Sequence, residues 1–176
     1  MTAAAIAFWL HGTDQRQTKL DRLRYWRAAL QLQHDRLLEP DPPGMSADEI
    51  ELRRRCDMHF YLVAAANLRK AALSLNDRFK DQRVASAIKA LDAAAPSIKK
   101  VRDFLEHFEA YDEGIGLEQK SGRVPAHRMA ETYKFNPGAD AQIEAFANRI
   151  SIAQTTPLVI ALADQVLGLN LDPSGW

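Results

Sequence analysis

Hydrophobic residues recur at intervals of three and four positions through the first two thirds of the chain, and this periodicity predicts α-helices. A first helix is expected over residues 14–38, and a proline-rich segment at 40–44 ends it because proline cannot continue a helix. The apolar positions of this helix are Leu20, Leu23, Trp26, Leu30 and Leu37.

A second helix is expected from Ser46 to about Asn76. Ser46 and Glu49 have the spacing of a capping box, in which each side chain bonds the backbone N–H of the other residue. The stretch 60–66 is apolar almost all round, which predicts that this helix is central. Its inward residues are expected to be Ile50, Cys56, Phe60, Val63, Ala64, Ala71 and Leu75.

Two shorter helices follow in the pattern. The first covers about 81–94 and ends before Pro96, and the second runs from a capping Ser97 to about Tyr111. Residues 113–139 hold four of the eight glycines and predict a loop.

The pattern changes in the last third of the chain. Residues 133–135 and 143–152 alternate well enough to predict a small β-hairpin, although a short helix over 139–149 is a competing prediction. Thr156 as a cap and Pro157 at the first helical position predict a last helix over 158–167.

These elements predict a mainly α fold, an antiparallel bundle of four to five helices with a small C-terminal β-hairpin. The 176 residues suit a single domain over 1–176. Its core bundle is expected over 14–112, and residues 113–176 are expected to add the loop, the hairpin and the last helix.

The composition limits the kinds of function and location that the protein can have. There are 23 basic and 23 acidic side chains, so bulk charge alone would not hold a nucleic acid. Cys56 is the single cysteine, which excludes an intrachain disulfide and predicts a cytoplasmic protein, with Cys56 itself in the core. The apolar N-terminal run lacks the basic start of a signal peptide, and no window approaches the ~20 apolar residues of a membrane span. We therefore expect a soluble protein with no membrane association.

One short motif carries candidate chemistry, the segment Arg102-Asp103-Phe104-Leu105-Glu106-His107. Asp103 and His107 are four residues apart on a predicted helix, so the carboxylate can bond a ring nitrogen of the imidazole and set its tautomer. Arg102 lies about 140° from His107 around the helix, so the two side chains converge only if the arginine reaches over or a second copy contributes.

This motif resembles the signature of HEPN domains (higher eukaryotes and prokaryotes nucleotide-binding), an Arg followed by a polar residue and then a His. The resemblance implies a small helical bundle, a homodimer and a metal-independent endoribonuclease or RNA-binding protein of toxin or defence type. Arg102, Asp103 and His107 would be the catalytic residues. RNA and an antitoxin protein would be partners, and no cofactor is expected.

Acidic residues are frequent around the motif, and the basic residues that could offset them are Lys99, Lys100, Arg123, His127 and Arg128. The alternative is a non-catalytic helical interaction or structural protein, in which Arg102 and Asp103 form surface ion pairs. A metal site formed by Asp57, His59 and the motif is a further alternative. The Glu-x-x-His pairs of di-metal bundles are absent, however, so we expect no metal.

Overall fold

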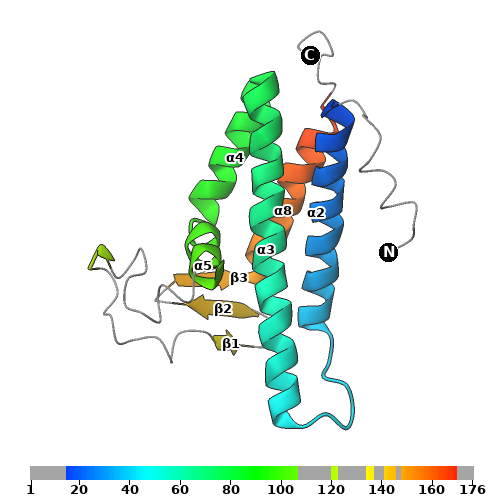
Figure 1. Ribbon diagram of the computed structural model, residues 1–176, viewed down its shortest axis with the longest axis vertical. Helices are drawn as coiled ribbons and strands as arrows, with labels where there is room; N and C mark the ends of the chain where they lie inside the picture. The colour runs from blue at the N-terminus through cyan, green and yellow to red at the C-terminus, as the bar shows by residue number, and fades with distance from the viewer. Residues whose placement is uncertain (1–14, 107–119, 123–133, 137–140, 146–147, 170–176) are drawn as a thin grey trace.

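The computed structural model describes residues 15–106, 120–122, 134–136, 141–145 and 148–169. Figure 1 shows a bundle of long helices with a small antiparallel sheet beside it, which confirms the predicted fold class. No helix among the described residues is long and apolar enough to cross a membrane.

Helices α2 (Gln15–Leu38) and α3 (Ala47–Phe79) form a long antiparallel hairpin. The predicted capping box starts α3: the Glu49 backbone N–H donates to Ser46 Oγ at 3.3 Å, and the Ser46 N–H donates to Glu49 Oε2 at 2.8 Å. Helix α3 extends three residues beyond the predicted end. It stops where Lys80 takes the left-handed conformation (φ 54°) and its N–H bonds the Asn76 carbonyl.

Helix α4 (Gln82–Ala94) follows the predicted range closely. Asp81 caps it by accepting from the Arg83 backbone N–H at 2.8 Å. The Arg83 guanidinium also bonds Asp81, and these hydrogen bonds lower the Asp81 pKa to about 2. Helix α5 (Ser97–Glu106) comes next and packs against α3.

The C-terminal part contains the predicted hairpin, formed by β2 (Gln142–Ala145) and β3 (Asn148–Ser151). A third strand, β1 (Lys134–Asn136), pairs antiparallel with β2. The competing short helix over 139–149 is wrong across both strands. Ile143 faces Ile150 in the register and both are buried, whereas Glu144 and Arg149 form an ion pair at 2.7 Å on the polar side.

Helix α8 (Ile152–Leu167) begins earlier than predicted. Ser151 caps it by accepting from the Gln154 N–H at 3.2 Å, so Thr156 is not the cap. Pro157 lies inside the helix, where it leaves the Ala153 carbonyl without its usual helical donor. Ala153 is exposed, and water can therefore satisfy that carbonyl.

Helix α8 lies within the bundle and contacts α2, α3 and α4. The centre of the core is apolar and closely packed. It includes Leu23, Leu30, Leu62, Leu68, Leu75, Ile88, Val159 and Leu162, all nearly inaccessible to solvent. Burial of each such side chain contributes about 1.5–3 kcal/mol, so these contacts hold the helices together.

The inward face of α3 differs from the prediction in its first half. Ala64, Ala71 and Leu75 are buried as expected, but Cys56 is exposed and 55% of Phe60 is exposed. The following positions turn inward instead: Asp57, Met58, Tyr61 and Leu62. The apolar stripe of the sequence is thus offset by about one residue from the face that α2 and α8 cover.

Candidate functional site

Helix α5 carries the first two residues of the Arg102–His107 motif. It is held against α3 and β3, with Ile98 and Val101 buried in the core. Arg102 is half-buried, while Lys99 and Lys100 are exposed one turn earlier. Because Lys99 precedes Arg102 by three residues, the two cations lie on neighbouring parts of the helix surface. This arrangement suits contact with a phosphate group.

His107 lies outside the described residues, and so do the side chain of Asp103 and the basic residues at 123–128. The expected hydrogen bond between Asp103 and His107 therefore stays a prediction. The same holds for the convergence of Arg102 and His107 in a two-copy cleft.

A second polar site lies inside the hairpin, near the α2–α3 loop. Asp57 is only 2% exposed, and its carboxylate meets the Arg36 Nε at 2.9 Å and the Arg53 Nε at 3.6 Å. Arg53 also reaches Glu39 at 3.0 Å. A buried carboxylate between two guanidiniums is neutralised in place, so this cluster has the character of a structural ion-pair network.

This network bears on the alternative of a metal site. The Asp57 oxygens are engaged by arginines, and neighbouring His59 is half-buried with its ring edge-on to Phe60 at 5.5 Å between centroids. Across the described ranges, no group of three or more His, Cys, Asp or Glu side chains could hold a metal ion.

Tyr61 forms a third buried polar contact, between α3 and α8. Its hydroxyl lies 2.9 Å from Thr156 Oγ1, and neither residue is accessible to solvent. Burial raises the pKa of Tyr61 to about 12, so the phenol stays protonated at physiological pH. The contact therefore positions α8 on α3 and offers no reactive group at the surface.

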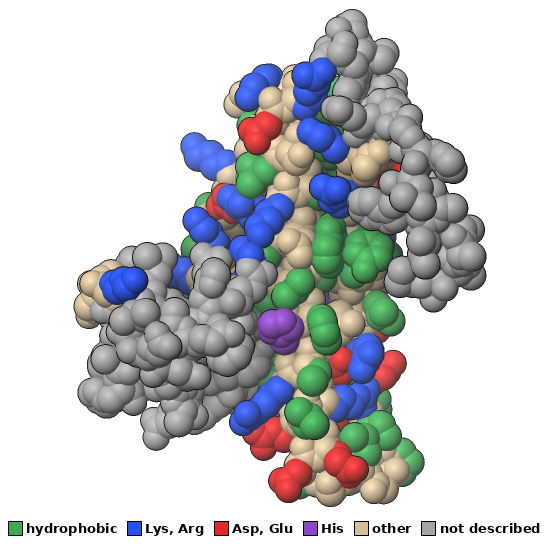
Figure 2. All heavy atoms as spheres, in the orientation of Figure 1, with side chains coloured by type: hydrophobic (Ala, Val, Ile, Leu, Met, Phe, Trp, Pro, Cys, Tyr) green, Lys and Arg blue, Asp and Glu red, His purple; other side chains and the backbone are tan. Residues whose placement is uncertain are grey.

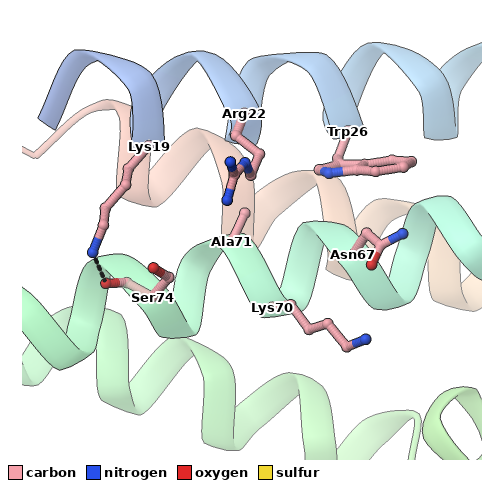
Figure 3. Close-up of a pocket in the computed structure, with 7 residues that line it drawn as sticks. All are labelled: Lys19, Arg22, Trp26, Asn67, Lys70, Ala71 and Ser74. Carbon is pink, nitrogen blue, oxygen red and sulfur yellow. Dashed lines mark hydrogen bonds between the residues drawn. The ribbon is translucent and has the colours of Figure 1, made fainter. Parts of the chain in front are cut away.

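A pocket of about 170 Å³ lies between α2 and α3, toward the end of the hairpin away from the loop. Figure 3 shows Lys19, Arg22 and Trp26 reaching it from successive turns of α2. The α3 side is lined by Asn67, Lys70, Ala71 and Ser74. At the end opposite Trp26, the Lys19 ammonium donates to the Ser74 carbonyl at 3.0 Å.

The pocket lies on a basic part of the surface. Figure 2 shows mainly Lys and Arg side chains, with few Asp and Glu, over the upper half of the visible face, whereas basic and acidic side chains are mixed in the lower half. The seven described lining residues include three cations and no carboxylate. This region can attract an anion, although the chain as a whole has no net charge.

The sequence pattern assigns Trp26 and Ala71 to the core and gives the other five lining residues no role. A signal does exist, because 19, 22 and 26 share one helical face and 67, 70, 71 and 74 share another. Only the antiparallel register of α2 on α3, which places Lys19 beside Ser74 and Trp26 beside Asn67, joins the two faces in one pocket.

Comparison of the chain with protein-family models, with curated proteins and with solved structures finds no match.

Proposed function

We propose that this protein is a HEPN-like, metal-independent endoribonuclease or RNA-binding protein of toxin or defence type, acting in the cytoplasm as a homodimer. The observation that carries the proposal is the position of Arg102 on α5, half-buried beside the exposed Lys99 and Lys100. A guanidinium held by the bundle can bind a phosphate through two parallel hydrogen bonds, and the lysines add attraction for the RNA backbone.

The proposed reaction uses the RNA's own 2′-hydroxyl as nucleophile. The hydroxyl oxygen attacks the adjacent phosphorus while a histidine takes its proton, and the P–O5′ bond breaks as the leaving oxygen gains a proton. The products are a 2′,3′-cyclic phosphate and a 5′-hydroxyl. In this scheme His107 moves the proton, Asp103 orients the imidazole, and Arg102 offsets the charge that develops on the phosphate.

A second copy of the chain completes the proposed site. Arg102 and His107 are five residues apart, which places them about 140° apart on an ideal helix. Arg102 of one copy would therefore act with His107 of the other. An antitoxin protein that covers this cleft would inhibit the enzyme.

The test is cleavage of single-stranded and structured RNA in the presence of a chelator. Arg102→Ala and His107→Ala should each lower the rate by about 100-fold or more, because each removes a group that acts on the transition state. Arg55→Ala and His59→Ala, which change the same residue types elsewhere on the surface, should leave the rate unchanged. The proposed endoribonuclease activity would be contradicted if the parent chain cleaved no RNA, or if the control variants lost as much of the cleavage rate as Arg102→Ala and His107→Ala.

Mixing the two inactive variants tests the two-copy cleft. A heterodimer of Arg102→Ala with His107→Ala retains one intact Arg102–His107 pair if the residues act between copies, so part of the activity should return. If both residues act within one copy, mixing restores nothing. Light scattering must also show a dimer.

A non-catalytic interaction protein is the second candidate, and the exposed apolar side chains on the hairpin favour it. Tyr25, Leu32, Leu52 and Phe60 are each more than half exposed. Such side chains are suited to contact with a partner protein. Under this alternative the parent chain cleaves no RNA, and Arg102→Ala changes only stability or association.

A further inference from the structure

The pocket between α2 and α3 combines features that recognise one class of ligand. We propose that it is a second binding site, separate from the Arg102 motif, for a 5′-nucleotide: its phosphate binds Lys19 and Arg22, its base stacks on Trp26, and Lys70 adds positive charge at the Trp26 end. In Figure 1, α5 lies on the other side of α3 from α2, so the pocket uses none of the residues of the motif.

The charges of the pocket fit a phosphate group. Lys19 and Arg22 are three residues apart on α2, so they lie on neighbouring parts of the helix surface, and Lys70 adds a third cation from α3. This local excess of positive charge attracts an anion. Lys19 uses one of its three N–H donors on the Ser74 carbonyl, so the ammonium is held in position with donors left for a ligand.

Trp26 supplies a platform for a planar ring. Its indole is half-buried and lies at the pocket end beside Asn67, whose amide can donate to or accept from a base or a sugar. The indole also packs edge-to-face on Tyr25, with 5.0 Å between centroids and 78° between planes. Stacking of a base on an aromatic side chain is tolerant of base identity.

The size of the pocket defines which part of the ligand it encloses. At about 170 Å³ it is smaller than the roughly 300 Å³ of sites that enclose a whole small molecule. The buried Ala71 forms part of its floor. A phosphate and part of a sugar fit inside, and the base then lies at the open edge on Trp26. This geometry suits a free nucleoside monophosphate or the 5′-phosphorylated terminal nucleotide of a single strand.

Calorimetric titration of the full chain with adenosine 5′-monophosphate, adenosine and inorganic phosphate tests the ligand class. The monophosphate should bind saturably at micromolar to millimolar concentration. Adenosine should bind at least about tenfold more weakly because it lacks the charge-assisted contacts. Phosphate alone should also bind more weakly, because it cannot stack.

Amino-acid substitutions then test whether the monophosphate binds in this pocket. The pair Arg22→Gln with Lys70→Gln should weaken monophosphate binding by about tenfold or more. Arg55→Gln with Lys89→Gln removes the same charge from exposed positions outside the pocket and should change binding by no more than about twofold. Trp26→Leu should weaken monophosphate binding but leave that of inorganic phosphate unchanged. Arg22 and Lys70 are exposed, so their double variant should fold even if Trp26→Leu does not.

A 5′-phosphorylated oligonucleotide with 2′-O-methyl sugars distinguishes the two sources of the ligand. Tenfold tighter binding than that of the monophosphate, lost when the 5′-phosphate is removed, supports a strand end. Equal or weaker binding supports a free nucleotide. The proposal is overturned if neither ligand binds saturably, or if the control pair weakens binding as much as the pocket pair.

Discussion

The two ends of the α2–α3 hairpin carry opposite charge. The loop end (residues 32–60) has seven carboxylates and four Lys and Arg side chains. The open end (residues 17–26 and 67–80) has seven Lys and Arg side chains and two carboxylates. The zero net charge of the chain is therefore an average over two opposite regions. At the loop end, Arg53 and Arg54 are bound by Glu39 and Asp41, so their charge is offset locally. At the open end Arg24 and Arg69 are also paired, with Asp21 and Asp92, but positive charge remains in excess there, and the pocket lies in this region.

The two ends also differ in what they bury. Both ends bury apolar side chains, Leu37 and Met58 at the loop end and Leu23 and Leu75 at the open end, but only the loop end also encloses the ion pairs of the buried Asp57. Polar contacts therefore add to apolar packing at the loop end. Substitutions at the two ends should consequently affect different properties of the protein.

Among the charged residues, the largest effect on stability is expected for Asp57→Ala. It removes a buried carboxylate and leaves Arg53, which is largely buried, without that partner, so the free energy of unfolding should fall by about 3 kcal/mol. Urea unfolding measures this change. Asp77→Ala, at an exposed position of the same helix, should stay within about 0.5 kcal/mol of the parent. If the two variants lose equal stability, the ion pairs of Asp57 do not stabilise the loop end.

Charge-matched double variants test the electrostatic difference. Arg22→Gln with Lys70→Gln, at the open end, should lower affinity for a single-stranded oligonucleotide by about tenfold and reduce the salt dependence of binding by about 1.4 in slope. Arg54→Gln with Arg55→Gln, at the loop end, should leave both quantities near the parent because carboxylates already offset these charges. Equal losses at both ends would mean that net charge alone governs binding.

Ser46→Ala tests the capping box at the loop end and should cost about 1 kcal/mol at pH 7. Hydrogen bonds from the Ser46 backbone N–H and hydroxyl lower the Glu49 pKa in the folded chain. That contribution is present above the ordinary pKa of glutamate, near about 4.3, and is lost as pH falls through the lowered value. Urea unfolding at a series of pH values should show a weaker acid dependence in Ser46→Ala, and an unchanged one would contradict this origin.

The smallest effect on stability is expected for Phe60→Ser. More than half of this side chain is exposed, so the free energy of unfolding should change by about 0.5 kcal/mol or less. The buried neighbour gives the contrast: Tyr61→Ala should cost about 4 kcal/mol. A large loss in Phe60→Ser would place Phe60 in an interface of the folded protein, which sedimentation of both variants would detect.

The helices of the hairpin could be predicted because their signals are local. The prolines before Gly44 end α2, and Ser46 with Glu49 starts α3, whichever elements pack against them. The predicted start of α8 was wrong because proline is common at the first position of a helix, and Pro157 therefore indicates a helix that starts there. Ile152 extends the helix backwards from that point, since its buried side chain fixes the register at the end of β3.

The inward face of α3 could not be predicted correctly because a single helix does not reveal which side its neighbours cover. Cys56 and Phe60 form a regular apolar stripe, yet Asp57 is the buried residue because Arg36 from α2 neutralises it. The pocket could not be predicted either, because the sequence of one helix does not show how its neighbour packs against it. It depends on the register between α2 and α3, whereas the Arg102–His107 motif is continuous in the sequence and could be found there.

Amide chemical-shift mapping with a 2′-O-methyl, 5′-phosphorylated oligonucleotide tests the central claim, that ligand binding belongs to the open end of the hairpin and to α5. The modification blocks the 2′-hydroxyl, so the ligand is bound without being cleaved. The largest shifts are expected near Lys19, Arg22, Trp26 and Lys70 and around Arg102, with the loop end unchanged. Shifts centred on residues 32–60, or none at saturating ligand, would contradict the account.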